Sequence, residues 1–140
     1  MPDRVLIVSD EQRHSAMRES LAQQGYFVTL IDDADRAFSE LLASQYAIVV
    51  VHLDHSVDGL AIDGLGFIKR IRQNRELQRL SILAVGEWGT GQPTMALGAG
   101  ADAFEPEPLN EERLITAVGK LMRPNLTMIA SASGVDGEKE

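Results

Sequence analysis

Four short polar segments carry the side chains that could do chemistry in this sequence, and each directly follows an apolar run. The first is Ser9-Asp10-Glu11, and the others are His52 to Asp54, Gly86 with Glu87, and Glu105 to Pro108. Carboxylates are the ligands that a hard cation such as Mg²⁺ prefers, and a histidine can exchange a proton near neutral pH. Either chemistry requires a fold that brings distant parts of the chain to one place.

The elements that would position these segments are short strand-like runs that alternate with segments of helical period. The predicted strands cover residues 5–8, 26–31, 46–51, 80–85 and 101–104. The predicted helices cover residues 12–24, a segment that follows Asp33, a segment from about 63, and residues 93–99 and 110–122. Asp32 or Asp33 caps the second helix, and the apolar face of that helix includes Leu41 and Leu42. Residues 86–92 are predicted to form a loop. This alternation predicts a doubly wound five-stranded parallel sheet between two helical layers, an α/β/α arrangement. Ligand sites in such sheets lie at the carboxyl ends of the strands, where the four polar segments would meet.

Length and composition limit the classes of function. The 140 residues fit one domain, which we expect to span residues 1–124, with a flexible tail or linker at 125–140. A formal charge of −8 gives little electrostatic support for nucleic-acid binding. The sequence has no cysteine, no secretory signal pattern and no apolar run long enough for a membrane span. We therefore expect a cytoplasmic protein that acts on protein partners and not on membranes.

Five motifs occur in an order and at spacings that are fairly specific as a set. In chain order they are Val5 to Glu11, Gly25-Tyr26, Tyr46, Asp63-Gly64-Leu65, and Gly100 to Phe104 with Pro108. Together they resemble the receiver domain of two-component response regulators, the CheY-like superfamily, over roughly residues 4–122. The resemblance implies a flavodoxin-like (βα)5 fold and a role in bacterial signal transduction.

The resemblance also implies a phosphorylation site, and this sequence departs from it. Receivers bind Mg²⁺ with an acidic pair after the first strand and form an acyl phosphate on an Asp that ends the third strand. A Ser or Thr after the fourth strand and a Lys after the fifth then contact the phosphoryl group. The residues at these positions are Ser9 and Asp10 for the acidic pair, His52 for the phosphoacceptor, Gly86 for the hydroxyl, and Glu107, just before Pro108, for the lysine.

These exchanges predict a pseudo-receiver that has no catalytic residue and no cofactor. An imidazole cannot form an acyl phosphate, and the carboxylate of Glu107 repels a phosphoryl group. His52 would instead donate a hydrogen bond to Asp10 or Glu107 and form a fixed internal ion pair. By resemblance, the domain would bind a kinase, an output domain or a second copy through its last strand and its fourth and fifth helices.

Two other functions stay open at this point. Side chains two residues apart in a strand face the same way, so Asp54 is an alternative phosphoacceptor to His52, with Mg²⁺ held at Asp10. A flavodoxin-like domain could also bind a small ligand at its strand ends, although no phosphate-binding Gly-rich turn follows the first strand.

Individual residues near the predicted site have alternative roles as well. Asp10 and Glu11 could be loop carboxylates that the dipole of the following helix favours, with no metal role. Trp88, the only tryptophan, either contacts a partner or covers the phosphate pocket. Phe104 is either the rotating aromatic residue that the resemblance implies or a buried strand residue.

Overall fold

The structure is a computed structural model that describes residues 3–9, 11–53, 64–86, 91–107 and 110–122, with only the backbone of 11–15. The strands are β1 (Arg4–Val8), β2 (Phe27–Ile31), β3 (Ile48–His52), β4 (Ser81–Gly86) and β5 (Ala103–Pro106). The helices are α1 (Glu11–Gln23), α2 (Ala34–Ala43), α3 (Gly64–Gln73), α4 (Gln92–Ala99), α5 (Glu111–Met122) and the 3-10 helix η2 (Arg75–Leu77). The alternation of strands and helices is the predicted one.

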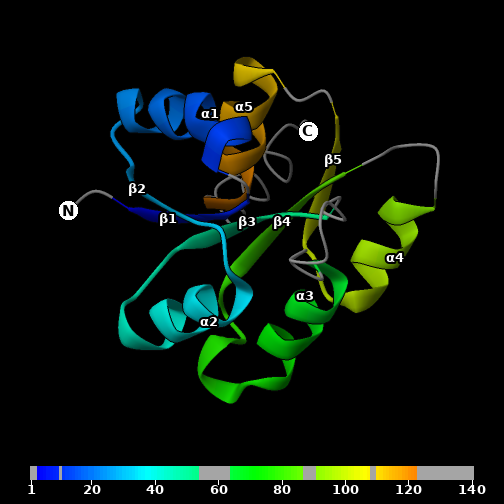
Figure 1. Ribbon diagram of the computed structural model, residues 1–140. Coiled ribbons are helices and arrows are strands. Elements are labelled where there is room, and N and C mark those ends of the chain that lie inside the picture. Colours follow the sequence, from blue (N-terminus) through cyan, green and yellow to red (C-terminus); the bar gives the residue numbers. More distant parts are fainter. Residues whose placement is uncertain (1–2, 10, 54–63, 87–90, 108–109, 123–140) are drawn as a thin grey trace, which may run out of the picture.

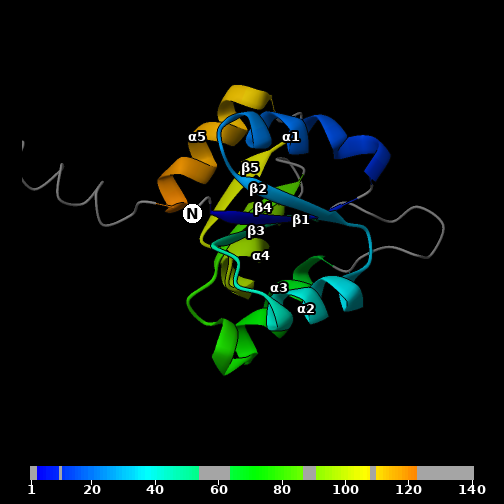
Figure 2. The ribbon, with the colours of Figure 1, turned by 90° about the vertical axis from the view of Figure 1, so that its left-hand side faces the viewer.

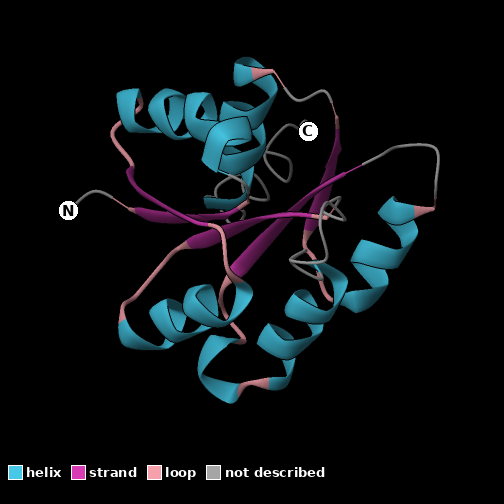
Figure 3. Ribbon diagram, viewed as in Figure 1, coloured by secondary structure: helices cyan, strands magenta, loops and turns pink. Residues whose placement is uncertain are grey.

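The five strands form one parallel sheet in the order β2-β1-β3-β4-β5. Helices α1 and α5 cover one face, and α2, α3 and α4 cover the other (Figures 1 and 2). Figure 3 shows the strands in magenta between these two helical layers. The predicted doubly wound, three-layer α/β/α class is therefore confirmed.

Strand β3 lies in the middle of the sheet and is buried along its whole length. Val49 and Val51 pack in the core beneath α2, α3 and α4, whereas Ile48 and Val50 pack in the core beneath α1 and α5. Because side chains alternate along a strand, His52 continues the side of Ile48 and Val50. The strand thus places the polar side chain of His52 next to the buried apolar side chains of Ile48 and Val50.

The ends of several helices follow signals that are visible in the sequence. Gly25 ends the α1 segment with φ of 96°, a left-handed conformation that costs glycine little. Asp33, and not Asp32, caps α2, because its carboxylate accepts two backbone N–H groups of the first turn. Asn110 caps α5 by accepting the N–H of Arg113 at 2.7 Å.

Several predicted boundaries are wrong by one or two residues. β2 begins at Phe27, β3 covers 48–52 and β5 covers 103–106, while residues 86 and 92 belong to β4 and α4 and not to a loop. The last strand begins late because the N–H of Ala101 still closes the end of α4 on the carbonyl of Ala96, at 3.0 Å. Asp102 then accepts the N–H of Ile82 with its side chain, at 2.7 Å.

The prediction that Leu42 belongs to the buried face of α2 is also wrong. Ala37 and Leu41 are buried in the core, whereas Leu42 is 43% exposed. Leu42 lies in the last turn of α2, where the helix borders a groove beside η2. The 3-10 helix η2 was not predicted, because three residues carry no helical period.

Some predictions concern residues outside the described part of the chain. The expected tail at 125–140 is one of them, as are the loop segments 54–63 and 87–90. Within the described ranges, no helix combines the length and the apolar character that a membrane crossing requires.

Candidate functional site

The carboxyl ends of β3, β4 and β5 meet at one edge of the sheet. His52 at the end of β3 pairs in register with Val85 on β4. The N–H of Glu107 donates to the carbonyl of Gly86 at 2.8 Å, so the chain after β5 still follows β4. Three of the four predicted polar segments therefore lie side by side.

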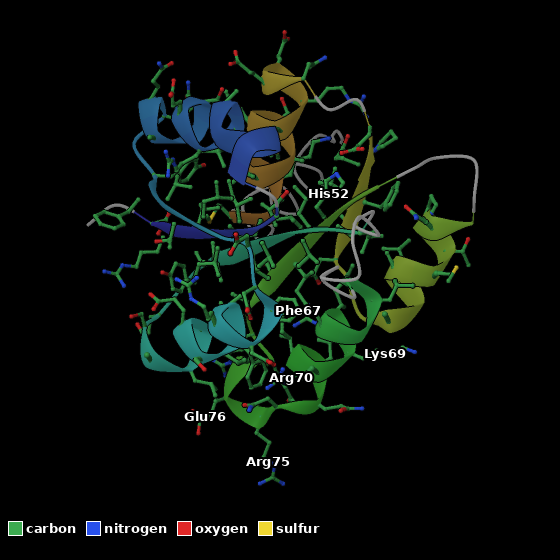
Figure 4. All side chains as sticks on the ribbon, viewed as in Figure 1. His52, Phe67, Lys69, Arg70, Arg75 and Glu76 are labelled. Atoms are coloured by element: carbon green, nitrogen blue, oxygen red, sulfur yellow. The ribbon has the colours of Figure 1, made fainter. Side chains whose placement is uncertain are left out.

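His52 is only 2% exposed, and its Nε2 contacts a carboxylate oxygen, Oε2 of Glu107. The Glu107 side chain is 24% exposed and reaches His52 from just beyond β5. Figure 4 shows His52 at the end of β3, on the side of the sheet that α5 covers. The structure thus pairs His52 with one of its two predicted partners, while the other, Asp10, lies outside the described residues.

The other predicted site residues are described unevenly. Ser9 is buried at the end of β1, and its N–H donates to the carbonyl of Ile31 at 3.1 Å. Glu11 opens α1, and only its backbone is described. The predictions for Asp54, Trp88 and Pro108 fall outside the described residues.

Gly86 is the last residue of β4, and the side chain of Gln92 fills the space where a larger residue would extend. A Cβ atom at Gly86 would collide with Oε1 of Gln92 and would lie 3.3 Å from Cβ of Leu53. The place that a Ser or Thr would take is therefore occupied by an amide from the first residue of α4. Gln92 was not predicted to be part of this site, because no sequence pattern connects a loop glutamine with a glycine six residues earlier.

Phe104 lies on β5 beside Ala84 of β4 and is partly buried. It packs against the core cluster that α2, α3 and α4 cover. It therefore faces away from the His52 side of the sheet, and its packing fits the role of a strand residue in the core.

The described residues do not provide a site for Mg²⁺. Among them, no group of three or more His, Asp or Glu side chains lies close enough to hold a metal ion. The described positions of the implied acidic pair and phosphoacceptor carry Ser9 and His52, and Mg²⁺ requires near-octahedral oxygen ligands. An imidazole is a poor substitute for the missing carboxylate.

Comparison with known proteins supports the receiver resemblance. No protein-family model matches the chain. Response regulator MprA of Mycolicibacterium vanbaalenii is 32% identical over 124 residues, which make up 88% of this chain and 52% of that protein. Protein PetR of Rhodobacter capsulatus is 29% identical over 123 residues, which make up 87% of this chain and 49% of that protein. The chain thus spans about half the length of the curated relatives that it matches.

The fold has close counterparts among solved structures. Chemotaxis response regulator CheY4 of Vibrio cholerae superposes with a TM-score of 0.76 at 18% identity, covering 86% of this chain and 99% of that one. At this level of identity the likeness shows the fold, and the relatives MprA and PetR show the kinship. The chain is a receiver-type domain related to the response regulators of two-component systems.

Proposed function

We propose that this domain works without phosphorylation, as a receiver-like module that acts by binding other proteins. The observation that carries the proposal is the contact between buried His52 and Glu107 at the carboxyl edge of the sheet. In this proposal the domain, residues 1–124, catalyses no reaction and needs no cofactor. Residues 125–140 serve as a tail or linker.

The chemistry of three positions supports the proposal independently. An acyl phosphate requires a carboxylate, and an imidazole stands at position 52. A transferred phosphoryl group carries negative charge and needs a cation or donors beside it, whereas Glu107 brings a second negative charge. Gln92 fills the space beside Gly86 and leaves less room for phosphoryl oxygens.

The surface of α4 supports a role in protein binding. Met95 is 52% exposed and Leu97 is 50% exposed, although both are large apolar side chains on a helix of eight residues. Exposed apolar side chains of this size lose unfavourable contact with water when a protein partner covers them. We propose that α4, β5 and α5 contact a kinase, an output domain or a second copy of this chain.

Phosphoryl transfer from acetyl phosphate tests the proposal directly. The protein is incubated with acetyl phosphate and Mg²⁺, and its intact mass is measured. We expect no gain of a phosphoryl group on the wild-type chain. A His52→Asp, Gly86→Thr, Glu107→Lys variant, which restores three positions of the receiver pattern, serves as the control for reagent activity.

Each positive result has a distinct meaning. A gain of mass that Asp54→Asn abolishes would establish the active receiver with an acceptor at Asp54 and would overturn the proposal. A gain that survives alkali and disappears in His52→Gln would instead show a phosphohistidine, because alkali hydrolyses an acyl phosphate. Either outcome contradicts a phosphorylation-independent domain.

A further inference from the structure

Strand β2 forms one edge of the sheet, and β5 forms the opposite edge. Among the described residues, β1 is the only strand that pairs with β2. Figure 2 shows the sheet from this edge, with β2 lying between the helical layer of α1 and that of α2. Within the described residues, the outer side of β2 therefore has no partner strand.

The ladder between β1 and β2 fixes which backbone groups of β2 point outward. Hydrogen bonds to the chain at either end of β1 use the N–H of Phe27 and the carbonyl of Ile31, at 2.9 and 3.1 Å. In a parallel ladder every second residue bonds to the neighbouring strand, so the backbone of Thr29 also faces β1. The N–H and C=O groups of Val28 and Leu30 therefore point to the outer edge.

The chain around β2 carries no charged residue. Residues 20–31 contain no Asp, Glu, Lys or Arg, although the protein as a whole has a formal charge of −8. They cover the end of α1, the turn at Gly25 and the whole of β2. Two copies of so acidic a chain repel each other over much of their surface. At an uncharged edge, two copies can approach without like charges meeting.

The opposite edge of the sheet lacks these properties. The N–H of Glu107 donates to the carbonyl of Gly86, and this phase of the ladder turns the backbone of Pro106 outward. Pro106 has no N–H to donate, and the neighbouring Glu105 is charged. Proline and charge on an edge strand oppose its pairing with another chain. Strand β2 contains neither.

We infer that β2 pairs antiparallel with β2 of a second copy of this chain, around a two-fold axis at Thr29. In this register Val28 lies opposite Leu30 of the second copy, and the two residues exchange a pair of hydrogen bonds. The two-fold axis repeats this pair, so all the outward N–H and C=O groups of both residues are used. Asp32 then lies opposite the uncharged Tyr26, whereas an in-register parallel pairing would bring the two Asp32 carboxylates together.

The same register covers an exposed aromatic side chain. Phe27 is 54% exposed, and the guanidinium of Arg4 lies 5.2 Å from the centre of its ring. Phe27 of one copy lies opposite Ile31 of the other, at a position without hydrogen bonds, where opposed side chains come closest. The dimer therefore buries apolar surface as well as pairing backbone groups.

This dimer goes beyond the protein contacts proposed for α4, β5 and α5. Because β2 and β5 lie at opposite edges, a dimer through β2 leaves the α4–β5–α5 surface of each copy open to other partners. One pair of short strands makes a small interface, so we expect weak, concentration-dependent association.

Sedimentation equilibrium of the full chain, from micromolar to millimolar concentration, tests for the dimer. Physiological salt is used, because it screens the repulsion between two acidic copies. We expect a monomer–dimer equilibrium, and amide hydrogen exchange at Val28 and Leu30 should slow as the dimer forms. Slow exchange of both amides at the lowest concentration would show that the chain covers this edge itself, which would overturn the inference.

Substitutions of Thr29 test the position of the axis. Thr29→Lys should weaken dimerisation at least about fivefold, because two lysines then face each other. Thr29→Glu should do the same, whereas an equimolar mixture of the two variants should form a heterodimer. Thr94→Lys and Thr94→Glu, at an exposed position of α4, are the matched controls and should dimerise as the wild type does.

A proline substitution tests the backbone pairing without adding charge. Val28→Pro removes an outward N–H and leaves the ladder to β1 intact, so it should weaken dimerisation at least about tenfold. Circular dichroism checks that each variant is folded. A wild type that stays monomeric at millimolar concentration would overturn the inference, as would folded Thr29 and Val28 variants that dimerise normally. Loss of the dimer in the Thr94 variants would assign the contact to α4 instead.

Discussion

Each end of the sheet has one set of polar side-chain contacts. The contacts of Arg72 at the amino end and of His52 at the carboxyl end differ in the groups that they join. At the amino end, Arg72 on α3 donates to the carbonyls of Gly100 and Leu80 at 2.7 and 2.8 Å and to Asp102 at 2.8 Å. At the carboxyl end, His52 meets Glu107 side chain to side chain. The first arrangement ties connections of the fold together, whereas the second stands where related domains would carry a phosphoryl group.

The two arrangements show how a fold can persist while the chemistry of its site changes. The sheet is held by apolar residues that alternate between two core clusters, most of them along the strands, and by Arg72 at the amino end. Residues at that edge can therefore change their chemistry with little effect on the core. What they must preserve is a partner for every buried polar group, which His52 and Glu107 provide for each other.

The largest expected effect comes from removing the amino-end arrangement. Arg72→Met should lower the free energy of unfolding by about 2–3 kcal/mol, because it deletes four hydrogen bonds of a largely buried cation, including one to the carbonyl of Gln78. Arg70→Met is the matched control, since Arg70 pairs with Asp35 at an exposed position and should cost less than about 1 kcal/mol. Urea unfolding measures both. Equal effects of the two substitutions would mean that Arg72 does not fasten the sheet.

The carboxyl-end arrangement should show a smaller but charge-specific effect. Glu107→Lys should cost about 2 kcal/mol and Glu107→Gln about 1 kcal/mol, since the lysine both removes the acceptor and brings a cation to a buried imidazole. Glu105→Gln, which alters the more exposed pair with Arg113, should cost less than about 0.5 kcal/mol. A stable Glu107→Lys variant would contradict the role given to the His52–Glu107 contact.

Substitutions at Gly86 and Gln92, with Gly98 as a control, test the side-chain packing at the carboxyl edge. Gly86→Ala should destabilise the domain by less than about 1 kcal/mol, because the new methyl group has to displace only the flexible end of Gln92. Gln92→Ala should reduce that cost. Gly98→Ala is the control in α4: a Cβ there meets nothing within 4 Å, so stability should rise by about 0.5–1 kcal/mol. Thermal unfolding of the single and double variants measures the coupling between residues 86 and 92.

The smallest expected effect is a pH dependence at the amino end. Burial and the hydrogen bond to Glu40 raise the pKa of Tyr46 above its usual value of 10.0. The folded state therefore holds the phenol proton more tightly than the unfolded chain. The resulting stability is complete below pH 10 and is lost as the pH rises through the pKa of the folded state.

Replacement of the second tyrosine isolates this group. In a Tyr26→Phe background Tyr46 is the only tyrosine, and tyrosinate absorbance then follows its ionisation. Above pH 10 the unfolding free energy of this protein should fall more steeply than that of Tyr26→Phe with Tyr46→Phe. Parallel curves of unfolding free energy against pH for the two proteins would show that folding does not raise the pKa of Tyr46.

The parts of the fold that follow local patterns could be predicted from the sequence. The continuous apolar run of β3 indicated a central strand, and its length placed His52 at the carboxyl edge. The negative charge of Glu107 beside that position suggested the contact that the structure contains. Parallel strands end at one edge, so the site could be assembled without knowing any side-chain geometry.

Contacts that join distant residues without a periodic pattern could not be predicted. Arg72 donates to the carbonyl of Gly100, 28 residues away, and the sequence of its own helix does not predict this hydrogen bond. The exposure of Leu42 depends on η2, which lies on another segment of the chain.

Beryllofluoride, which mimics a phosphoryl group on a carboxylate, tests the central claim most directly. We would titrate the ¹⁵N-labelled protein with beryllofluoride and Mg²⁺ and follow the amides at the ends of β3, β4 and β5. The account predicts no saturable change, because His52 and Glu107 stand at the positions of the acceptor and the lysine, and Gln92 fills the space beside Gly86. A saturable, Mg²⁺-dependent shift at Gly86 and Glu107 that Asp54→Asn removes would contradict it.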